Sequence, residues 1–176
     1  MITSTHIQQI EGIEGEFLFI IDSDINPALD AYKSALSSST VKRKFNFIAT
    51  PNSNQWNKIR DLANNVVNYF GSESSVRKGA IINELTSASI EKLCLVFIDS
   101  GDENSYNDIL NKISSKLSNN AKVILKCVDT LPILDYINNN NIIEPTLLSS
   151  GYVSFTNKKK ALVLGEKVSK EVSNNF

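Results

Sequence analysis

Histidine, cysteine and proline are scarce in this chain of 176 residues, which holds one histidine, two cysteines and four prolines. No apolar run approaches the length of about 18 residues that marks a membrane span, so no transmembrane segment is predicted. Residues 1–15 lack a basic start followed by an apolar run. No secretory signal is therefore visible, and a cytoplasmic or nuclear location is the default expectation.

An excess of charge is also lacking, since 18 basic residues face 19 acidic ones and the formal net charge is −1. A large nucleic-acid footprint needs clustered cations, so this balance argues against a nucleic-acid partner. Two basic clusters exist, at residues 42–44 and 158–160, and each lies between apolar segments. Because charge runs usually face water, a solvated turn is the preferred interpretation of both, and a phosphate contact is the alternative.

The two cysteines, Cys94 and Cys127, lie inside apolar runs, where cysteine usually behaves as a small hydrophobic residue. Two thiols and one histidine cannot complete a four-ligand zinc site unless carboxylates supply the rest. We therefore expect both thiols to be buried, reduced and free of metal. A disulfide between neighbouring strands is the alternative, and an intracellular location disfavours it.

Continuous apolar runs are the strongest signals that are present, and they are typical of strands buried on both faces of a parallel sheet. They predict strands near residues 17–21, 45–49, 93–98 and 122–127. Helices are predicted between these runs. Asn26 and Pro27 are expected to cap and begin one helix, and Ser105 is expected to cap another.

An apolar stripe with spacings of three and four runs from Trp56 through Val66 to Phe70 and predicts a further helix. The three side chains are expected to be largely buried against the sheet. For Trp56 a ligand-stacking surface is the less favoured alternative.

The remaining segments give weaker patterns. Residues 71–79 are polar and predict a loop, and residues 80–85 predict a weak edge strand. Residues 131–148 are helical in tendency but are broken by prolines and asparagines. Residues 152–155 and 161–165 flank a polar link and predict an antiparallel hairpin.

Strands and helices thus alternate four times before the hairpin, which predicts right-handed crossovers and a three-layer, mostly parallel α/β sheet. An antiparallel end is a common addition to such a sheet. The length predicts one domain, residues 1–165, followed by a polar tail or the start of a linker at residues 166–176.

The first strand-to-helix turn, residues 22–27, lacks the glycines that would let the backbone approach a nucleotide or adenosyl ligand. Its two carboxylates, Asp22 and Asp24, would repel a phosphate. No phosphate-binding loop motif occurs in the chain, and the second strand ends at residues 49–51 without an acidic residue to bind a ribose hydroxyl. The sequence therefore predicts no cofactor site at this turn.

Catalytic and metal-binding candidates are few. His6 lies in the polar leader before the first strand, so a histidine-dependent nucleophilic mechanism would have to recruit it from there. Asp99, Asp102 and Glu103 occupy a loop at the carboxyl end of a strand and could bind a cation or act as acid and base. A solvated loop is the preferred interpretation. The sequence therefore predicts no catalytic, cofactor-binding or metal-binding residue.

Three stretches carry patterns of a known family. Residues 15–21 form an apolar strand followed by a helix that begins with proline, and residues 93–126 form a strand, an amphipathic helix and a second strand. Residues 147–153 fit the pattern L-x-x-S-G-[FLY]-V, and residues 164–167 fit a closing strand. Together they resemble the N-terminal methyltransferase-like domain of the anamorsin family. That family usually has an L-x-P-G-G turn where this chain has residues 117–121.

The resemblance implies the fold of S-adenosylmethionine-dependent methyltransferases without a working cofactor site, because the family also lacks glycine in the first turn. It implies a role in cytosolic iron–sulfur cluster assembly and electron transfer, with a diflavin reductase and other assembly factors as protein partners. The family holds its clusters in a cysteine-rich C-terminal domain, and these 176 residues contain no such cysteine motif. The expectation is a non-catalytic interaction domain without cofactor. The alternatives are a methyltransferase with a degenerate cofactor motif and an unrelated α/β scaffold subunit.

Overall fold

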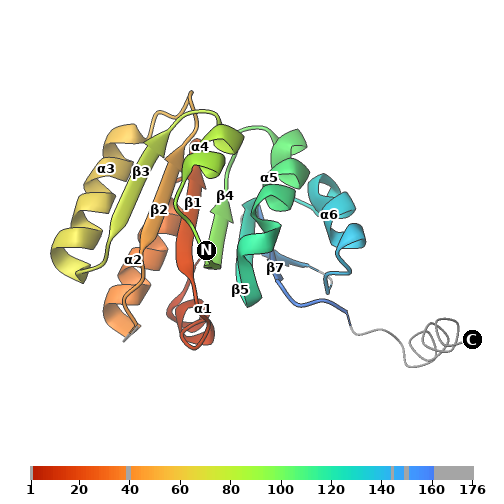
Figure 1. The fold of residues 1–176 in the computed structure, drawn as a ribbon, viewed down its shortest axis with the longest axis horizontal. Helices are drawn as coiled ribbons and strands as arrows, with labels where there is room; N and C mark the ends of the chain where they lie inside the picture. Colours follow the sequence, from red (N-terminus) through yellow and green to blue (C-terminus); the bar gives the residue numbers. More distant parts are fainter. Residues whose placement is uncertain (1, 39–40, 144, 149–150, 161–176) are drawn as a thin grey trace, which may run out of the picture.

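The computed structural model describes residues 2–38, 41–143, 145–148 and 151–160, and its centre is a seven-stranded sheet of order β3-β2-β1-β4-β5-β7-β6. The strands are β1 (Glu16–Ile21), β2 (Phe45–Ala49), β3 (Ser74–Lys78), β4 (Leu93–Ile98), β5 (Leu117–Lys126), β6 (Thr146–Leu148) and β7 (Tyr152–Thr156). Strands β1 to β5 are parallel, and β7 runs antiparallel to β5 and β6 (Figure 1). The predicted mostly parallel sheet with an antiparallel end is confirmed.

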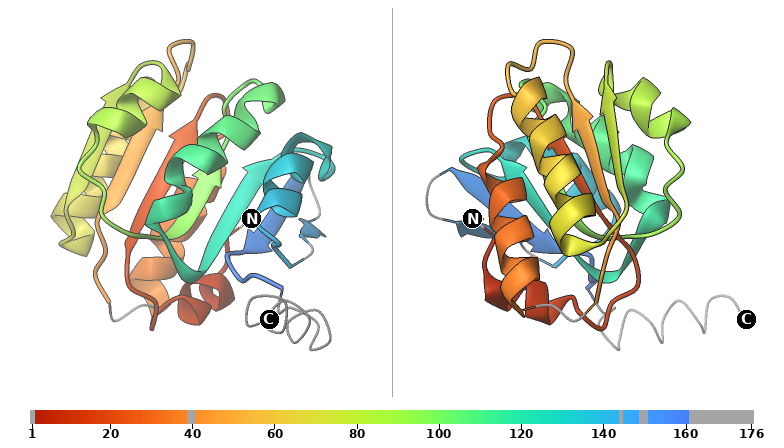
Figure 2. Two further views of the ribbon diagram at one scale, coloured as in Figure 1. Left: turned by 45° about the vertical axis from the view of Figure 1, so that its right-hand side comes forward. Right: turned by 90° about the vertical axis from the view of Figure 1, so that its left-hand side faces the viewer.

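Helices cover both faces of the sheet, as the second view of Figure 2 shows. Side chains of α1 (Ser4–Gln9), α2 (Asn26–Ser38) and α3 (Trp56–Asn65) pack into one apolar cluster on one face. Side chains of α4 (Ile81–Ser87), α5 (Tyr106–Ile113) and α6 (Leu134–Asn139) pack into a second cluster on the other face. A π-helix (Val66–Phe70) extends α3. Among the described residues no helix is long and apolar enough to cross a membrane.

The central strands were predictable because both of their faces are covered. Every residue of β2 and β4 is buried, and so are the five residues of β1 after Glu16. Phenylalanines stack between β1 and β2 on one face, with the rings of Phe19 and Phe47 5.6 Å apart. Such offset aromatic pairs add stability beyond the area they bury, so this region anchors the fold.

Two predicted elements were wrong, and they are neighbours in the structure. Part of the predicted loop 71–79 forms strand β3, and the predicted edge strand 80–85 lies mostly in helix α4. Strand β3 is half-exposed and polar because it is the edge of the sheet, so it lacks the apolar pattern of the central strands.

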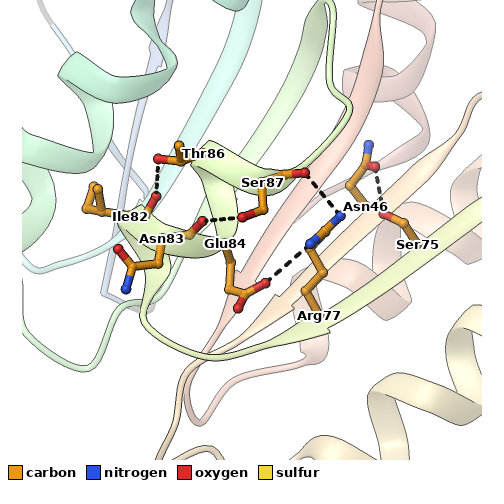
Figure 3. A network of polar contacts seen from close by, with 8 residues as sticks. All are labelled: Asn46, Ser75, Arg77, Ile82, Asn83, Glu84, Thr86 and Ser87. Carbon is orange, nitrogen blue, oxygen red and sulfur yellow. Dashed lines mark hydrogen bonds and ion pairs between the residues drawn. The ribbon is translucent and has the colours of Figure 1, made fainter.

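Polar contacts hold these two misassigned elements together (Figure 3). The guanidinium of Arg77 on β3 reaches helix α4, where it pairs with Glu84 at 3.5 Å and donates to the Ser87 carbonyl at 3.2 Å. Ser75 donates from β3 to the Asn46 side chain on β2 at 2.8 Å. Charged and hydroxyl side chains therefore make the contacts between elements here that apolar side chains make in the centre of the sheet.

Three further predictions are corrected or completed by the structure. The polar leader contains helix α1. Residues 152–155 of the predicted hairpin lie in β7, which pairs antiparallel with β5 and β6, whereas residues 161–165, like the predicted tail, lie outside the described residues. On the apolar stripe, Val66 and Phe70 are buried as predicted but Trp56 is only partly buried.

Candidate functional site

A cavity of about 420 Å³ opens at the carboxyl edge of the sheet, where β1, β4 and β5 end. It is lined by Asp22, Ser23, Asp99, Gly101, Glu103, Tyr106, Lys126, Cys127, Val128 and Gly151. Strand order reverses between β1 and β4, and open α/β sheets bind ligands at the carboxyl ends beside such a reversal. The position of this cavity, which we call the carboxyl-edge pocket, is therefore the expected one for a ligand.

The carboxylate of Asp99 organises the first turn of the fold. Asp99 follows β4 and is only 3% exposed. Its Oδ2 accepts hydrogen bonds from the backbone N–H groups of Ser23 at 2.9 Å and Asp24 at 3.0 Å. Backbone amides at a strand-to-helix turn commonly bind the anionic group of a ligand. In this protein the carboxylate of Asp99, which follows the neighbouring strand β4, occupies these amides.

Asp22 presents the second carboxylate of the pocket. Thr50, at the end of β2, donates its hydroxyl to Asp22 Oδ1 at 2.6 Å, and Ser53 donates to the Asp22 carbonyl at 2.7 Å. Gly101 has a φ of +75°, and a Cβ there would lie 2.8 Å from the Asp22 carboxyl carbon. Only glycine therefore allows the loop after β4 to approach this carboxylate so closely.

Two further contacts tie the first turn to the other half of the sheet. Lys126, the last residue of β5, donates from Nζ to the Ser23 hydroxyl at 3.1 Å. The Tyr152 hydroxyl of β7 donates to Asp24 Oδ2. The ionisable side chains of the pocket include the carboxylates of Asp22, Asp99 and Glu103 and a single ammonium, that of Lys126, so the cavity is acidic.

The phenol and the thiol of the pocket hold their protons at neutral pH. Burial, with a further contribution from the charge of Asp99, raises the pKa of Tyr106. Burial, together with the nearby carboxylates of Glu103 and Asp129, raises the pKa of Cys127 to about 12. A thiol with such a pKa is a poor nucleophile, so the groups able to accept a proton here are carboxylates.

The structure separates the three acidic residues that the sequence singled out. Asp99 and Glu103 line the pocket, although Asp99 is held by backbone amides. Asp102 is exposed and accepts from the Asn104 N–H at 3.0 Å, which caps a short 3-10 turn. Within the described residues no three acidic, histidine or cysteine side chains group in a way that could hold a metal ion.

His6 has a local structural role and does not line the pocket. Its Nδ1 accepts from the Thr3 N–H at 3.1 Å, and the Thr3 hydroxyl in turn accepts from the His6 N–H, so the two residues cap helix α1. Burial and then the charge of Lys122 lower the pKa of His6. Cys94 and Cys127 are free thiols and are buried, as predicted.

The basic cluster 42–44 contains a structural residue that neither interpretation of the sequence anticipated. Arg43 is 7% exposed, and its guanidinium donates to the carbonyls of Ile10, Glu11 and Gly15 at 2.8 to 2.9 Å. These carbonyls belong to the chain that leads into β1. Arg43 is thus neither solvated nor available to a phosphate, and no sequence pattern could have revealed its distant partners.

No family model and no curated protein matches the chain. Solved structures do match it. The O-methyltransferase NovP is 15% identical over 89% of this chain and 78% of its own, with a TM-score of 0.65. CalS11, a TDP-rhamnose 3′-O-methyltransferase of calicheamicin biosynthesis, is 11% identical over 85% of this chain and 74% of its own, with a TM-score of 0.65. The Bacillus cereus O-methyltransferase in complex with SAH is 14% identical over 87% of this chain and 78% of its own, with a TM-score of 0.54.

These similarities confirm the methyltransferase-like fold and correct one prediction. The expectation that this chain is not an enzyme is contradicted, because solved structures that share its fold over 85–89% of the chain include O-methyltransferases. The glycine-free turn carried that expectation, and it was too narrow a criterion, because a cavity forms at the carboxyl edge without those glycines. The resemblance to the anamorsin family and the partners it implies remain predictions.

The carboxyl-edge pocket has the volume of an ordinary ligand site, and its charged groups suit one end of S-adenosylmethionine. Ligand pockets typically measure about 300–1,000 Å³, and this one lies within that range. The carboxylates of Asp22 and Glu103 complement an ammonium and a sulfonium, and the ammonium of Lys126 complements a carboxylate. The ribose end has no acidic partner at the end of β2, because Thr50 occupies that position and is bonded to Asp22.

Proposed function

We propose that the chain is an S-adenosylmethionine-dependent methyltransferase with a degenerate cofactor motif, acting on a hydroxyl group. The observation that carries the proposal is the acidic pocket at the strand-order reversal of a sheet shared with O-methyltransferases. An acidic pocket stabilises a ligand with two positive centres and disfavours phosphate-bearing ligands such as dinucleotides.

Each pocket residue has a definable part in this proposal. S-adenosylmethionine supplies an electrophilic methyl group when it is bound. Asp22, held close to the loop after β4 by Gly101, offers its carboxylate to a positive centre. The Asp99 carboxylate holds the first turn in place through two backbone N–H groups, so the shape of this turn does not depend on glycines.

Glu103 is the carboxylate best placed to accept the proton that a hydroxyl substrate loses. It is exposed, it begins the short 3-10 turn after β4, and it lines the pocket. Tyr106 and Cys127 are excluded from this role because both keep their protons at neutral pH. Val128, 75% exposed, adds an apolar wall to the mouth of the pocket.

Calorimetry with S-adenosylmethionine tests the proposal directly. We expect saturable binding with a dissociation constant near or below about 100 μM, which corresponds to roughly −5.5 kcal/mol. Asp22→Asn is expected to weaken binding about tenfold through loss of a charge beside a positive centre. Asp102→Asn is the matched control, because this carboxylate is exposed and lies outside the pocket lining. Absence of saturable heat at millimolar cofactor would refute the proposal.

Transfer of a labelled methyl group to small hydroxyl-bearing acceptors, such as catechols, tests the reaction itself. Glu103→Gln is expected to lower kcat about 100-fold while leaving cofactor binding within about threefold, since general base catalysis contributes roughly that much. A variant with unchanged kcat at every pH would remove Glu103 from the role of base.

A further inference from the structure

A second cavity, of about 510 Å³, lies at the opposite, amino edge of the sheet, where β2 and β3 begin. It is lined by Lys44, Val67, Gly71, Ser72, Glu73, Ser74 and Ser75. We call it the amino-edge groove. It shares no residue with the carboxyl-edge pocket, so what it binds is independent of the proposed methyltransferase activity.

Two hydroxyl groups in this groove have no hydrogen-bond partner among the residues that the structure describes. Among the side chains that the structure describes, only Ser72 Oγ and Ser74 Oγ are buried polar atoms without a hydrogen bond, and both residues line the groove. The Ser72 residue is only 7% exposed. Folded proteins give nearly all buried polar groups a partner, so two unpartnered hydroxyls at one cavity indicate a partner that binds from outside the chain.

Positive charge and open space surround these hydroxyls. Gly71 has a φ of +73°, and a Cβ there would lie 2.7 Å from Lys42 Nζ, so this ammonium rests directly over the glycine. Lys42 forms no ion pair within the part of the chain that the structure describes, and Lys44 is only loosely paired with Glu16 at 3.9 Å. Glu73, which also lines the groove, is exposed.

The backbone of β3 adds a donor at the same place. The Glu73 carbonyl accepts from the Phe45 N–H at 3.0 Å, so the backbone groups of Glu73 face β2. Because successive residues of a strand point their backbone groups to opposite sides, the N–H of Ser74 faces away from the sheet. Strand β3 is the edge of the sheet, so no further strand of the described part of the chain takes this donor.

We infer that the amino-edge groove binds the phosphate group of a small phosphomonoester. Two serine hydroxyls and a backbone N–H supply hydrogen bonds to the phosphate oxygens, and Lys42 and Lys44 supply the opposite charge. The π-helix supplies the apolar side: Val67 lines the groove at 49% exposure. Single π-helical turns are frequent at functional sites, and this one places a hydrophobic residue where the body of the ester would lie.

Amide chemical shifts of the full chain, followed by NMR during titration with inorganic phosphate and with phenyl phosphate, test the inference. Saturable shifts are expected at Gly71, Ser72 and Ser74, with dissociation constants in the millimolar range for phosphate and about fivefold tighter for phenyl phosphate. The double variant Ser72→Ala, Ser74→Ala and the variant Lys44→Met are each expected to weaken binding at least fivefold.

Matched controls are Ser87→Ala, whose hydroxyl bonds to the Asn83 carbonyl on α4, and Lys92→Met, whose exposed ammonium pairs with Glu14. Neither is expected to change phosphate binding. Thermal unfolding gives a second readout: phosphate should raise the Tm of the parent protein and leave that of the double serine variant unchanged. Shifts that fail to saturate by about 50 mM phosphate, or that persist in the double variant, would overturn the inference. A crystal structure grown in phosphate with only water at both hydroxyls would also overturn it.

Discussion

The two edges of the sheet satisfy their backbone groups with opposite charges. At the carboxyl edge the carboxylate of Asp99 accepts from two backbone N–H groups, and at the amino edge the guanidinium of Arg43 donates to three backbone carbonyls. Both side chains are more than nine-tenths buried. Each occupies backbone groups that water or a ligand would otherwise bind, and each edge still keeps one cavity.

The comparison teaches that a buried charge can shape an edge without being its binding group. The exposed charges beside these two residues, Glu103 at one edge and Lys42 at the other, are the ones free to meet a ligand. Substitutions at the two buried charges should therefore change stability, and substitutions at the exposed ones should change binding.

Replacement of Arg43 tests the amino edge and should have the largest effect. Arg43→Met removes three charge-assisted hydrogen bonds and leaves carbonyls of the segment before β1 without this donor. We expect the free energy of unfolding to fall by about 3 kcal/mol or more. Urea denaturation followed by circular dichroism measures it.

Lys92→Met is the control for the loss of a positive charge, because Lys92 and Glu14 form an exposed pair. Its expected cost is below about 1 kcal/mol. An Arg43→Met variant no less stable than this control would show that the three carbonyls find other partners, and the parallel between the edges would fail.

Asp99→Asn tests the carboxyl edge and should have the next largest effect. The amide keeps the size of the carboxylate but accepts from Ser23 and Asp24 without a negative charge, so the hydrogen bonds weaken. A loss of about 2 kcal/mol in the free energy of unfolding is expected. The exposed cap variant Asp102→Asn should lose less than half of that, and equal losses would contradict the special role of Asp99.

The sequence predicted the central strands of the sheet much better than its edge strand β3 and the neighbouring helix α4. Strand β4, residues 93–98, could be recognised because burial on both faces leaves a continuous apolar run. Strand β3 could not be recognised, because it contacts α4 and β2 through polar side chains, which leave no periodic pattern of apolar residues in the sequence. Helix α4 is short, and its apolar start at residues 80–82 is equally consistent with a strand.

The candidate site was predictable in part for a related reason. Asp22, Asp99 and Glu103 could be placed at the carboxyl edge because each follows an apolar run or lies in the loop after it. What could not be predicted was that the Asp99 carboxylate turns inward to the first turn, 76 residues away from Ser23 along the chain. The roles of Lys126 and Gly101 likewise depend on contacts between distant strands.

The two thiols sharpen the comparison because the cation of Arg43 lies near one of them and two carboxylates lie near the other. The pKa of Cys94, at the amino edge, is raised to about 11, chiefly by burial and slightly by the carboxylate of Glu16, with the cation of Arg43 partly offsetting the rise. The pKa of Cys127 is raised to about 12 by burial and by the carboxylates of Glu103 and Asp129 together. Both folded-state values exceed the ordinary value of 9.0, so the unfolded state releases these protons first.

The contribution of the protonated thiols to the free energy of unfolding should therefore be fully present below about pH 9 and should fall as the pH rises toward 11. Cys94 alone should contribute a loss of about 2 kcal/mol over that interval. Cys94→Ala is expected to show a shallower decline once its stability is normalised to pH 7, in urea titrations at several pH values. Identical declines in parent and variant would mean that the folded protein does not raise the pKa of this thiol.

The smallest expected effect concerns the hydrogen bond that joins the first turn to the antiparallel end of the sheet. Tyr152→Phe removes the hydroxyl that donates to Asp24 and leaves the ring, which packs edge-on against Phe97 with centroids 6.2 Å apart. Because Asp24 can be solvated in its place, the cost should stay below about 1 kcal/mol. A double-mutant cycle with Asp24→Asn isolates the pairwise free energy, which should equal most of that loss. A coupling near zero would show that Tyr152 does not help to hold the first turn in place, whereas a coupling well above 1 kcal/mol would make β7 a structural support of the carboxyl-edge pocket.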